Sequence, residues 1–144
     1  MTHFERLGLP GRFDVDAGEL ERAFLAASRT VHPDHHADGQ DDTAAVNAAY
    51  HTLRDPLRRA EYLLGLMPAT GTVPPDPEFL TAMMADRERA EAGDPTVATD
   101  LAARLSGLTA DLGRQFAADD ATAVRRTLAA AKTVRSLLRQ LAGD

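Results

Sequence analysis

Apolar residues recur at intervals of three and four positions along most of the chain. In the first half they form stripes over residues 20–31 and 46–53, and in the second half over residues 97–112 and 124–141. This spacing gathers the apolar side chains of each stretch on one face of an α-helix, whereas a half-buried β-strand alternates apolar and polar residues. No stretch of the sequence shows such alternation. The pattern therefore predicts an all-α fold.

Capping residues divide this pattern into separate helices. Thr2 with Glu5, and Asp16 with Glu19, match the capping box, in which two side chains satisfy backbone N–H groups at a helix start. An Asp followed by a Pro also indicates a helix start, because Pro fits the first helical position. Three such pairs are present, and they are Asp55-Pro56, Asp76-Pro77 and Asp94-Pro95.

The remaining helix boundaries follow from glycine, proline and aspartate. Gly8 ends a short first helix. Pro33 ends the second helix, because the residue before a proline is disfavoured in the α conformation. We expect Asp41 or Asp42 to cap the third helix, and residues 119–120 to form the turn before the last one.

A proline-rich stretch separates two parts of the chain. Residues 67–77 contain four prolines and no apolar stripe, which is typical of a linker or a domain boundary. We interpret residues 1–68 as one domain, residues 69–75 as a linker and residues 76–144 as a second domain. Three helices with short connections in the second domain predict an antiparallel three-helix bundle.

Composition narrows the classes of function. The chain has 144 residues, of which 44% are hydrophobic and 26% charged, and its net charge is −6. An acidic chain of this kind is not expected to bind nucleic acid or an anionic membrane as its main task. It has no cysteine, which excludes disulfides, thiol nucleophiles and cysteine-bound metal within this chain. No apolar run reaches transmembrane length and the polar N-terminus is unlike a signal peptide, so we expect a cytoplasmic protein.

The histidine-rich stretch "HPDHHAD" leaves one chemical question open. It could be a metal site, because imidazole and carboxylate groups are common ligands of divalent metals. The five side chains that could act as ligands are His32, Asp34, His35, His36 and Asp38. Pro33 argues against a helix that would bring them together, and a solvated loop is the simpler interpretation. The sequence contains no Gly-x-Ser-x-Gly motif and no phosphate-binding glycine loop, so no catalytic residue and no cofactor are expected.

The same stretch resembles a known family. "HPD" after one helix and before another is similar to the loop of J-domains, which bind DnaK-type chaperones and stimulate their ATP hydrolysis. The segments "HFERLGLPGRF", residues 3–13, and "VNAAYHTLRDPLRRAEYLLGL", residues 46–66, resemble the HscB branch, the co-chaperones of iron–sulfur cluster assembly. The residues that match the signature of that branch are Pro56, Leu57, Arg59, Ala60, Glu61, Tyr62, Leu63 and Leu64.

The resemblance implies an HscA- or DnaK-type chaperone as a partner. His32, Pro33 and Asp34 would then form the chaperone-binding loop, with Asp34 accepting charge-assisted hydrogen bonds from an arginine of the partner. Arg22 and Arg29 lie seven residues apart and therefore share a helix face. Each lies two residues, about 200° of helical rotation, from an apolar stripe position, so both are expected to point outward. Leu25 and Ala26 lie on this helix where the family has more cations.

The resemblance also implies that the second domain binds an IscU-type iron–sulfur scaffold protein. Leu80, Met84 and Glu88 are spaced four residues apart and match the scaffold-binding region of the family by position. Phe79 and Met83 form the neighbouring stripe and are expected in the bundle core. The alternative, that Leu80 and Met84 also lie in the core, stays open at this point. On the last helix, Thr133 replaces an aromatic residue that the family has there.

Three functional hypotheses follow. The first is an HscB-type co-chaperone, without enzymatic activity of its own, that recruits a chaperone to an iron–sulfur scaffold. The second is a general J-protein that serves DnaK with other clients, and the signature over residues 56–64 argues against it. The third is a metal-binding protein that uses the histidine-rich loop.

Overall fold

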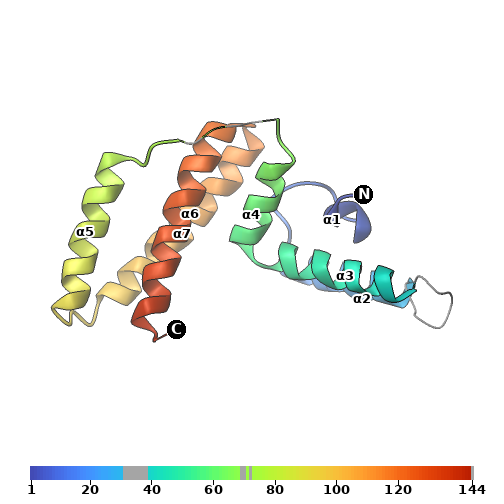
Figure 1. Cartoon of the computed structure of the whole chain (residues 1–144), viewed down its shortest axis with the longest axis horizontal. Helices are drawn as coiled ribbons and strands as arrows, with labels where there is room; N and C mark the ends of the chain where they lie inside the picture. Colours follow the sequence, from blue (N-terminus) through green and yellow to red (C-terminus); the bar gives the residue numbers. More distant parts are fainter. Residues whose placement is uncertain (31–38, 69–70, 72, 144) are drawn as a thin grey trace. The chain divides into compact units, whose positions relative to one another are not determined.

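The computed structural model describes residues 1–30, 39–68, 71 and 73–143 of the chain, and in this part it contains seven helices and no strand (Figure 1). The prediction of an all-α fold is therefore confirmed. The chain divides into two compact units, Met1–Leu66 and Met67–Asp144, called unit 1 and unit 2 below. The helices of unit 1 are α1 (His3–Arg6), α2 (Ala17–Thr30), α3 (Gly39–Arg54) and α4 (Pro56–Gly65). Those of unit 2 are α5 (Pro77–Glu91), α6 (Val97–Ala117) and α7 (Ala121–Leu141).

The capping box predicted at Thr2 and Glu5 is complete, whereas at Asp16 and Glu19 one of the two predicted hydrogen bonds is present. The Thr2 hydroxyl accepts a hydrogen bond from the Glu5 N–H, and the Glu5 carboxylate accepts one from the Thr2 N–H, which completes a capping box. Gly8 follows α1 at φ +69°, in the left-handed region that glycine adopts without steric cost. The Asp16 carboxylate accepts a hydrogen bond from the Glu19 N–H at 3.0 Å at the start of α2.

The core of unit 1 lies between α1 and the hairpin formed by α2 and α3. Both hairpin helices contribute the apolar positions that the periodicity predicts, and α1 contributes the fully buried Phe4. The buried members of this cluster are Phe4, Leu7, Leu9, Leu20, Val46, Ala49 and Leu53. The helix α3 begins at Gly39, earlier than the expected cap at Asp41 or Asp42. Positions 41 and 42 therefore lie within the helix, and the expectation that one of them precedes it as the cap is wrong.

Unit 2 is a three-helix bundle, as predicted, in which α6 and α7 pack together along most of their length (Figure 1). The helix α5 contacts both of them more sparingly. Asp76 caps α5 by accepting a hydrogen bond from the Glu78 N–H, and Asp120 caps α7 by accepting one from the Ala123 N–H. The buried cluster between the three helices comprises Met83, Val97, Leu101, Val134 and Leu137.

The predicted start of α6 at Asp94-Pro95 is two residues early. The helix begins at Val97, because the Asp94 carboxylate accepts hydrogen bonds from both the N–H and the hydroxyl of Thr96 and thereby forms a turn before the helix. The Arg89 guanidinium then joins the end of α5 to this turn. It donates to Asp94 at 2.9 Å and to Asp100 at 2.7 Å.

Candidate functional site

The outward face of α2 carries the two arginines that were predicted from the sequence to bind a chaperone. Arg22 and Arg29 are exposed, and Leu25 lies between them with 45% of its surface exposed. On the opposite side of the helix, Leu20 is buried in the core of unit 1 and Phe24 is partly buried against it. The prediction that both arginines point outward is therefore correct, and Leu25 adds an apolar side chain to the same face.

The tripeptide that suggested chaperone binding lies directly after this helix in the chain. The helix α2 ends at Thr30 and α3 begins at Gly39, so His32, Pro33 and Asp34 belong to the segment that connects the two helices of the hairpin. Residues 31–38 are outside the described part of the chain. The prediction about these three residues therefore stays a prediction.

Contacts between α2 and α3 hold the arginine-bearing helix in place. The rings of Phe24 and Tyr50 stack with their centroids 4.2 Å apart. The Tyr50 hydroxyl donates a hydrogen bond to the Glu21 carboxylate at 2.5 Å, and this bond raises the pKa of the Tyr50 phenol. Sequence periodicity placed Tyr50 on the inner face of α3 but gave no sign of its partner, which lies 29 residues away. The two helices are thus joined by a ring stack and a polar contact as well as by their apolar core.

Arg59, one of the residues that match the HscB signature, connects separate segments of unit 1. Its side chain is buried, and it donates hydrogen bonds to the carbonyl oxygens of Phe13 and Leu53, both at 2.7 Å. The guanidinium carbon also lies 4.8 Å from the centre of the Phe13 ring. Burial lowers the pKa of Arg59, while Asp14 and Asp55 act in the opposite direction. Arg59 thus ties α4 both to the end of α3 and to the segment between α1 and α2.

A second signature residue, Tyr62, connects α4 to α1. Its hydroxyl accepts a hydrogen bond from the His3 backbone N–H at 2.9 Å, and its ring stacks on the His3 imidazole with the centroids 4.3 Å apart. Burial lowers the pKa of His3, and the charge of Arg6 lowers it further. Arg59 and Tyr62, which the sequence identified only as a match to a family pattern, therefore hold the first and last helices of unit 1 on the hairpin.

In unit 2 the two stripes of α5 separate as predicted. Leu80 and Met84 are 46% and 66% exposed, and Glu88 is exposed one turn further along the helix. Met83 is buried in the bundle core and Phe79 is partly buried against it. The alternative in which Leu80 and Met84 belong to the core is therefore wrong. Two large apolar side chains exposed one turn apart are typical of a protein-binding surface.

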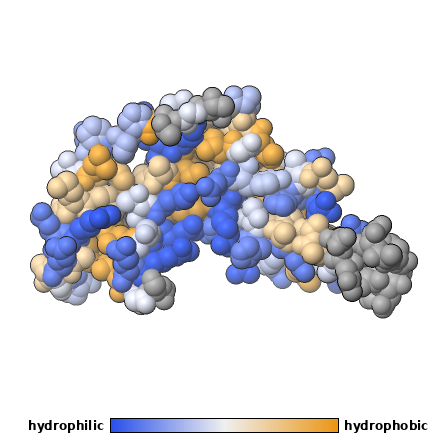
Figure 2. Space-filling view, viewed as in Figure 1, coloured by the Kyte–Doolittle hydropathy of each residue, from blue (hydrophilic) through white to orange (hydrophobic). Residues whose placement is uncertain are grey.

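A groove that the sequence did not predict lies beside these exposed residues. It has a volume of about 550 Å³ and is bounded by one side of α5, by α7 and by part of α6. We call it the α5 groove. Its lining is mainly apolar and includes Phe79, Leu80, Met83, Met84, Leu108, Ala129, Ala130 and Thr133, with Asp76, Arg87, Asp111 and Arg126 among its polar members. Figure 2 shows apolar surface over α5 next to hydrophilic residues.

The described residues give no support to the metal hypothesis. Outside the histidine-rich segment, no three His, Asp or Glu side chains among the described residues are grouped closely enough to hold a metal ion. The side chains on which the hypothesis depends, from His32 to Asp38, lie outside that part of the chain. Nor is any helix in the described ranges long and apolar enough to cross a membrane.

A helical hairpin that carries His-Pro-Asp in its connecting segment, followed by a separate three-helix bundle, is the architecture of a J-domain protein with an added helical unit. Comparison with known proteins narrows this class. No family model matches the chain. A co-chaperone protein HscB homolog from Ralstonia nicotianae is 39% identical, over an alignment that covers 74% of this chain and 69% of that protein. The homolog from Bordetella petrii is 40% identical, with 72% and 69% covered.

Solved structures agree with these relatives. Chaperone HscB from Vibrio cholerae superposes with a TM-score of 0.82 at 31% identity, covering 99% of this chain and 96% of that one. The crystal structure of the human co-chaperone protein HscB gives a TM-score of 0.84, with 99% and 81% covered, and at 24% identity it supports the fold alone. The chain belongs to the HscB family of co-chaperones.

Proposed function

We propose that this co-chaperone stimulates the ATPase of an HscA- or DnaK-type chaperone and delivers an IscU-type iron–sulfur scaffold protein to it. The observation that carries the proposal is its membership of the HscB family, together with an exposed α2 face that bears Arg22 and Arg29 and leads directly to His32-Pro33-Asp34. The partner hydrolyses ATP, so the chain needs no active site of its own. We place this activity in the cytoplasm.

Chaperone binding in this proposal depends on charge. Arg22 and Arg29 face carboxylates on the chaperone, and such complementary charges increase the rate of association more than they increase affinity. Asp34 accepts charge-assisted hydrogen bonds from an arginine of the chaperone. Pro33 restricts the backbone beside Asp34 and so reduces the entropy lost when the segment binds.

Scaffold binding in this proposal uses the exposed face of α5. Leu80 and Met84 supply apolar contact area, and Glu88 supplies a charge one turn away. Interface energy is concentrated in a few central side chains, and a flexible methionine adapts to the surface it meets. The two activities use different units of the chain, since the chaperone-binding residues lie in unit 1 and the scaffold-binding residues in unit 2.

The proposed stimulation of the chaperone ATPase is tested by steady-state ATPase assays with purified HscA- and DnaK-type chaperones. We expect the wild type to stimulate hydrolysis and Asp34→Asn to abolish the stimulation while leaving the far-UV circular dichroism spectrum unchanged. Glu19→Gln, which changes a carboxylate in the first turn of α2, is the matched control and should keep the stimulation. Full stimulation by a folded Asp34→Asn variant would refute the proposed mechanism.

The same assays distinguish the alternatives. A general J-protein would stimulate a DnaK-type chaperone at least as well as an HscA-type chaperone, and the scaffold would make no difference. The metal hypothesis is tested separately by titrating zinc into the protein in a calorimeter. Tight zinc binding that is lost in a His35→Ala/His36→Ala variant would favour the histidine-rich segment as a metal site.

A further inference from the structure

The C-terminal half of α5 is joined to α6 by a cluster of charged side chains. The Arg89 guanidinium donates hydrogen bonds to four side chains, which are Asp86 at 3.2 Å, Asp94 at 2.9 Å, Thr96 at 2.9 Å and Asp100 at 2.7 Å. Asp86 also lies 3.6 Å from the guanidinium of Arg104 on α6. We call these six residues the Arg89 cluster. It holds the end of α5, the following turn and the start of α6 together at one end of the bundle.

Asp86 makes this contact specific in position. It is 5% exposed, and its Oδ2 atom has no hydrogen bond, so the charge of Arg104 at 3.6 Å is its nearest compensation. A buried carboxylate that is separated from its partner is costly. We therefore expect this end of α5 to keep its place on α6.

The N-terminal half of α5 has no comparable contact. Among the described residues, no hydrogen bond or ion pair joins residues 77–85 to α6 or α7. Polar contacts with α7 occur only in the linker before the helix. There Arg125 donates to the Gly71 carbonyl at 2.7 Å, and Arg126 lies 3.4 Å from the Pro74 carbonyl oxygen, which is long for a hydrogen bond. Polar contacts therefore hold one half of α5 directly and the other half only through the linker.

The α5 groove provides space beside the half that is held less firmly. Its lining includes Phe79, Leu80, Met83 and Met84 of α5 but no member of the Arg89 cluster. Helices that are close-packed along their whole length cannot tilt against each other, whereas a groove of about 550 Å³ leaves room for movement. A helix of 15 residues is about 22 Å long, so a tilt of about 10° around one end moves the other end by about 4 Å.

We propose that α5 is a hinged helix, whose pivot is the Arg89 cluster and whose N-terminal half swings toward and away from α6 and α7. The rigid part of unit 2 is the pair α6 and α7, which pack together along most of their length (Figure 1). This inference goes beyond the proposed function, because it concerns the free protein and needs no partner. Leu80 moves with the swinging half, so any molecule that contacts it in one arrangement shifts the equilibrium toward that arrangement.

The swing is measured as a distribution of distances between two spin labels by electron paramagnetic resonance. The chain has no cysteine, so introduced cysteines are the only sites that are labelled. Thr81→Cys with Ser136→Cys reports on the swinging half, and Ala92→Cys with Thr122→Cys reports on the pivot end. All four positions are exposed, and each pair joins α5 to α7. We expect the first distribution to be about twice as wide as the second. Equal widths would refute the hinge.

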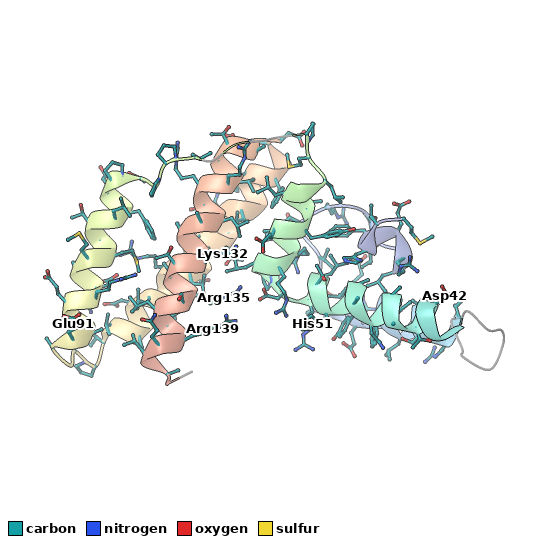
Figure 3. The ribbon with its side chains drawn as sticks, viewed as in Figure 1. Asp42, His51, Glu91, Lys132, Arg135 and Arg139 are labelled. Atoms are coloured by element: carbon teal, nitrogen blue, oxygen red, sulfur yellow. The ribbon has the colours of Figure 1, made fainter. Side chains whose placement is uncertain are left out.

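The position of the pivot is tested with a variant of its central residue. Arg89→Gln should widen the distribution of the Ala92–Thr122 pair about twofold, because the end of α5 is no longer held on α6. Glu91→Gln is the matched control, since Glu91 lies at the same end of α5 but outside the Arg89 cluster (Figure 3). It should leave the width unchanged. An unchanged width in Arg89→Gln, or equal widening in both variants, would show that the cluster is not the pivot. Far-UV circular dichroism verifies that both variants are folded.

Hydrogen exchange distinguishes a swing from local unfolding. A helix that swings as a rigid body keeps its backbone hydrogen bonds, so the amides of residues 81–85 should stay protected in the wild type. If they exchange as fast as in an unfolded peptide, the wide distribution arises from unfolding of the N-terminal half, and the hinge is wrong. None of these measurements uses a chaperone or a scaffold, so their results do not depend on the proposed function.

Discussion

Among single residues, Arg59 joins two separate parts of unit 1. It is a buried cation whose two hydrogen bonds end on carbonyl oxygens from different parts of the chain. Replacing Arg59 by Met keeps most of the apolar stem but leaves both carbonyl groups without this donor. A buried polar group without a partner costs about 1–3 kcal/mol. Because two such groups lose their donor, we expect Arg59→Met to lower the free energy of unfolding of unit 1 by about 2–4 kcal/mol.

The stability that Arg59→Met loses can be measured in unit 1 alone. The chain has two tyrosines, Tyr50 and Tyr62, and no tryptophan, so tyrosine fluorescence during urea denaturation reports on unit 1. The control is Arg58→Met, which removes a half-exposed arginine whose contact with Asp55 spans 3.9 Å. Its effect should stay below about 1 kcal/mol, as is usual for exposed ion pairs. Equal losses in the two variants would mean that the buried hydrogen bonds of Arg59 add nothing specific.

His3 makes the stability of unit 1 depend on pH. Because burial against Tyr62 lowers the pKa of His3 in the folded state, the unfolded state binds more protons between the two pKa values. The contribution of neutral His3 is fully present above the ordinary value of 6.5 and is lost as the pH falls from there through the lower folded value. We expect the tyrosine-monitored urea midpoint of the wild type to decrease between pH 7.5 and 5. The decrease should be smaller in His3→Gln, and identical pH profiles would contradict the assignment to His3.

At the scale of the helix, α5 offers two adjacent methionines with opposite environments. Met83 is 4% exposed and belongs to the buried cluster of unit 2, whereas Met84 is 66% exposed. Met83→Ala should lower the free energy of unfolding by about 2–5 kcal/mol, the usual cost of removing a large side chain from a core. Met84→Ala should change it by less than about 0.5 kcal/mol, as is usual at exposed positions.

The two methionine variants also distinguish an effect on folding from an effect on binding. Urea denaturation followed by far-UV circular dichroism gives the free energy of unfolding of each variant. Calorimetry against the IscU-type scaffold gives its binding affinity. We expect Met84→Ala to weaken scaffold binding and Met83→Ala, in its folded fraction, to affect binding less. The reverse order of effects on stability would show that the exposed stripe of α5 had been assigned to the wrong side of the helix.

The turn between α5 and α6 depends on the partly buried Asp94. Hydrogen bonds from Thr96, and then from Arg89, lower the pKa of Asp94 from 3.8 to about 2. An acid with a lowered pKa in the folded state contributes stability above its unfolded pKa and loses it as the pH falls through the folded one. Unit 2 should therefore lose stability between about pH 4 and pH 2. In Asp94→Asn this part of the acid sensitivity should disappear and the melting temperature at pH 7 should be lower, which a series of thermal melts by circular dichroism would measure.

For the whole molecule, the proposed function requires both units on one chain. Asp34→Asn should lose chaperone stimulation and keep scaffold binding, and Leu80→Ala/Met84→Ala should do the opposite. An equimolar mixture of these two variants is expected to fall short of the wild type when ATPase stimulation is measured at limiting scaffold concentration. The physical reason is that one chain raises the effective concentration of its two partners for each other. Full recovery in the mixture would mean that the two activities are independent.

Much of the local structure was predictable, because it depends on residues a few positions apart. Apolar spacing gave the helices, and the capping box at Thr2 and Glu5 and the cap at Asp76 fixed two of their starts. The register of α5 also separated Met83 from Met84, since helical geometry alone places neighbours on different faces. The helix starts that were missed, at Gly39 and Val97, depend on how the preceding turns fold.

Only the tertiary structure decided how distant residues meet. Phe13 and Arg59 are 46 positions apart and His3 and Tyr62 are 59 apart, so no local pattern could reveal their hydrogen bonds. The α5 groove is also a property of three helices together, because its volume depends on how sparingly α5 packs against α6 and α7. The sequence determined which faces are apolar through backbone geometry, which is local. Which apolar side chains stay uncovered depends on the packing of separate elements, and that was decided by the fold.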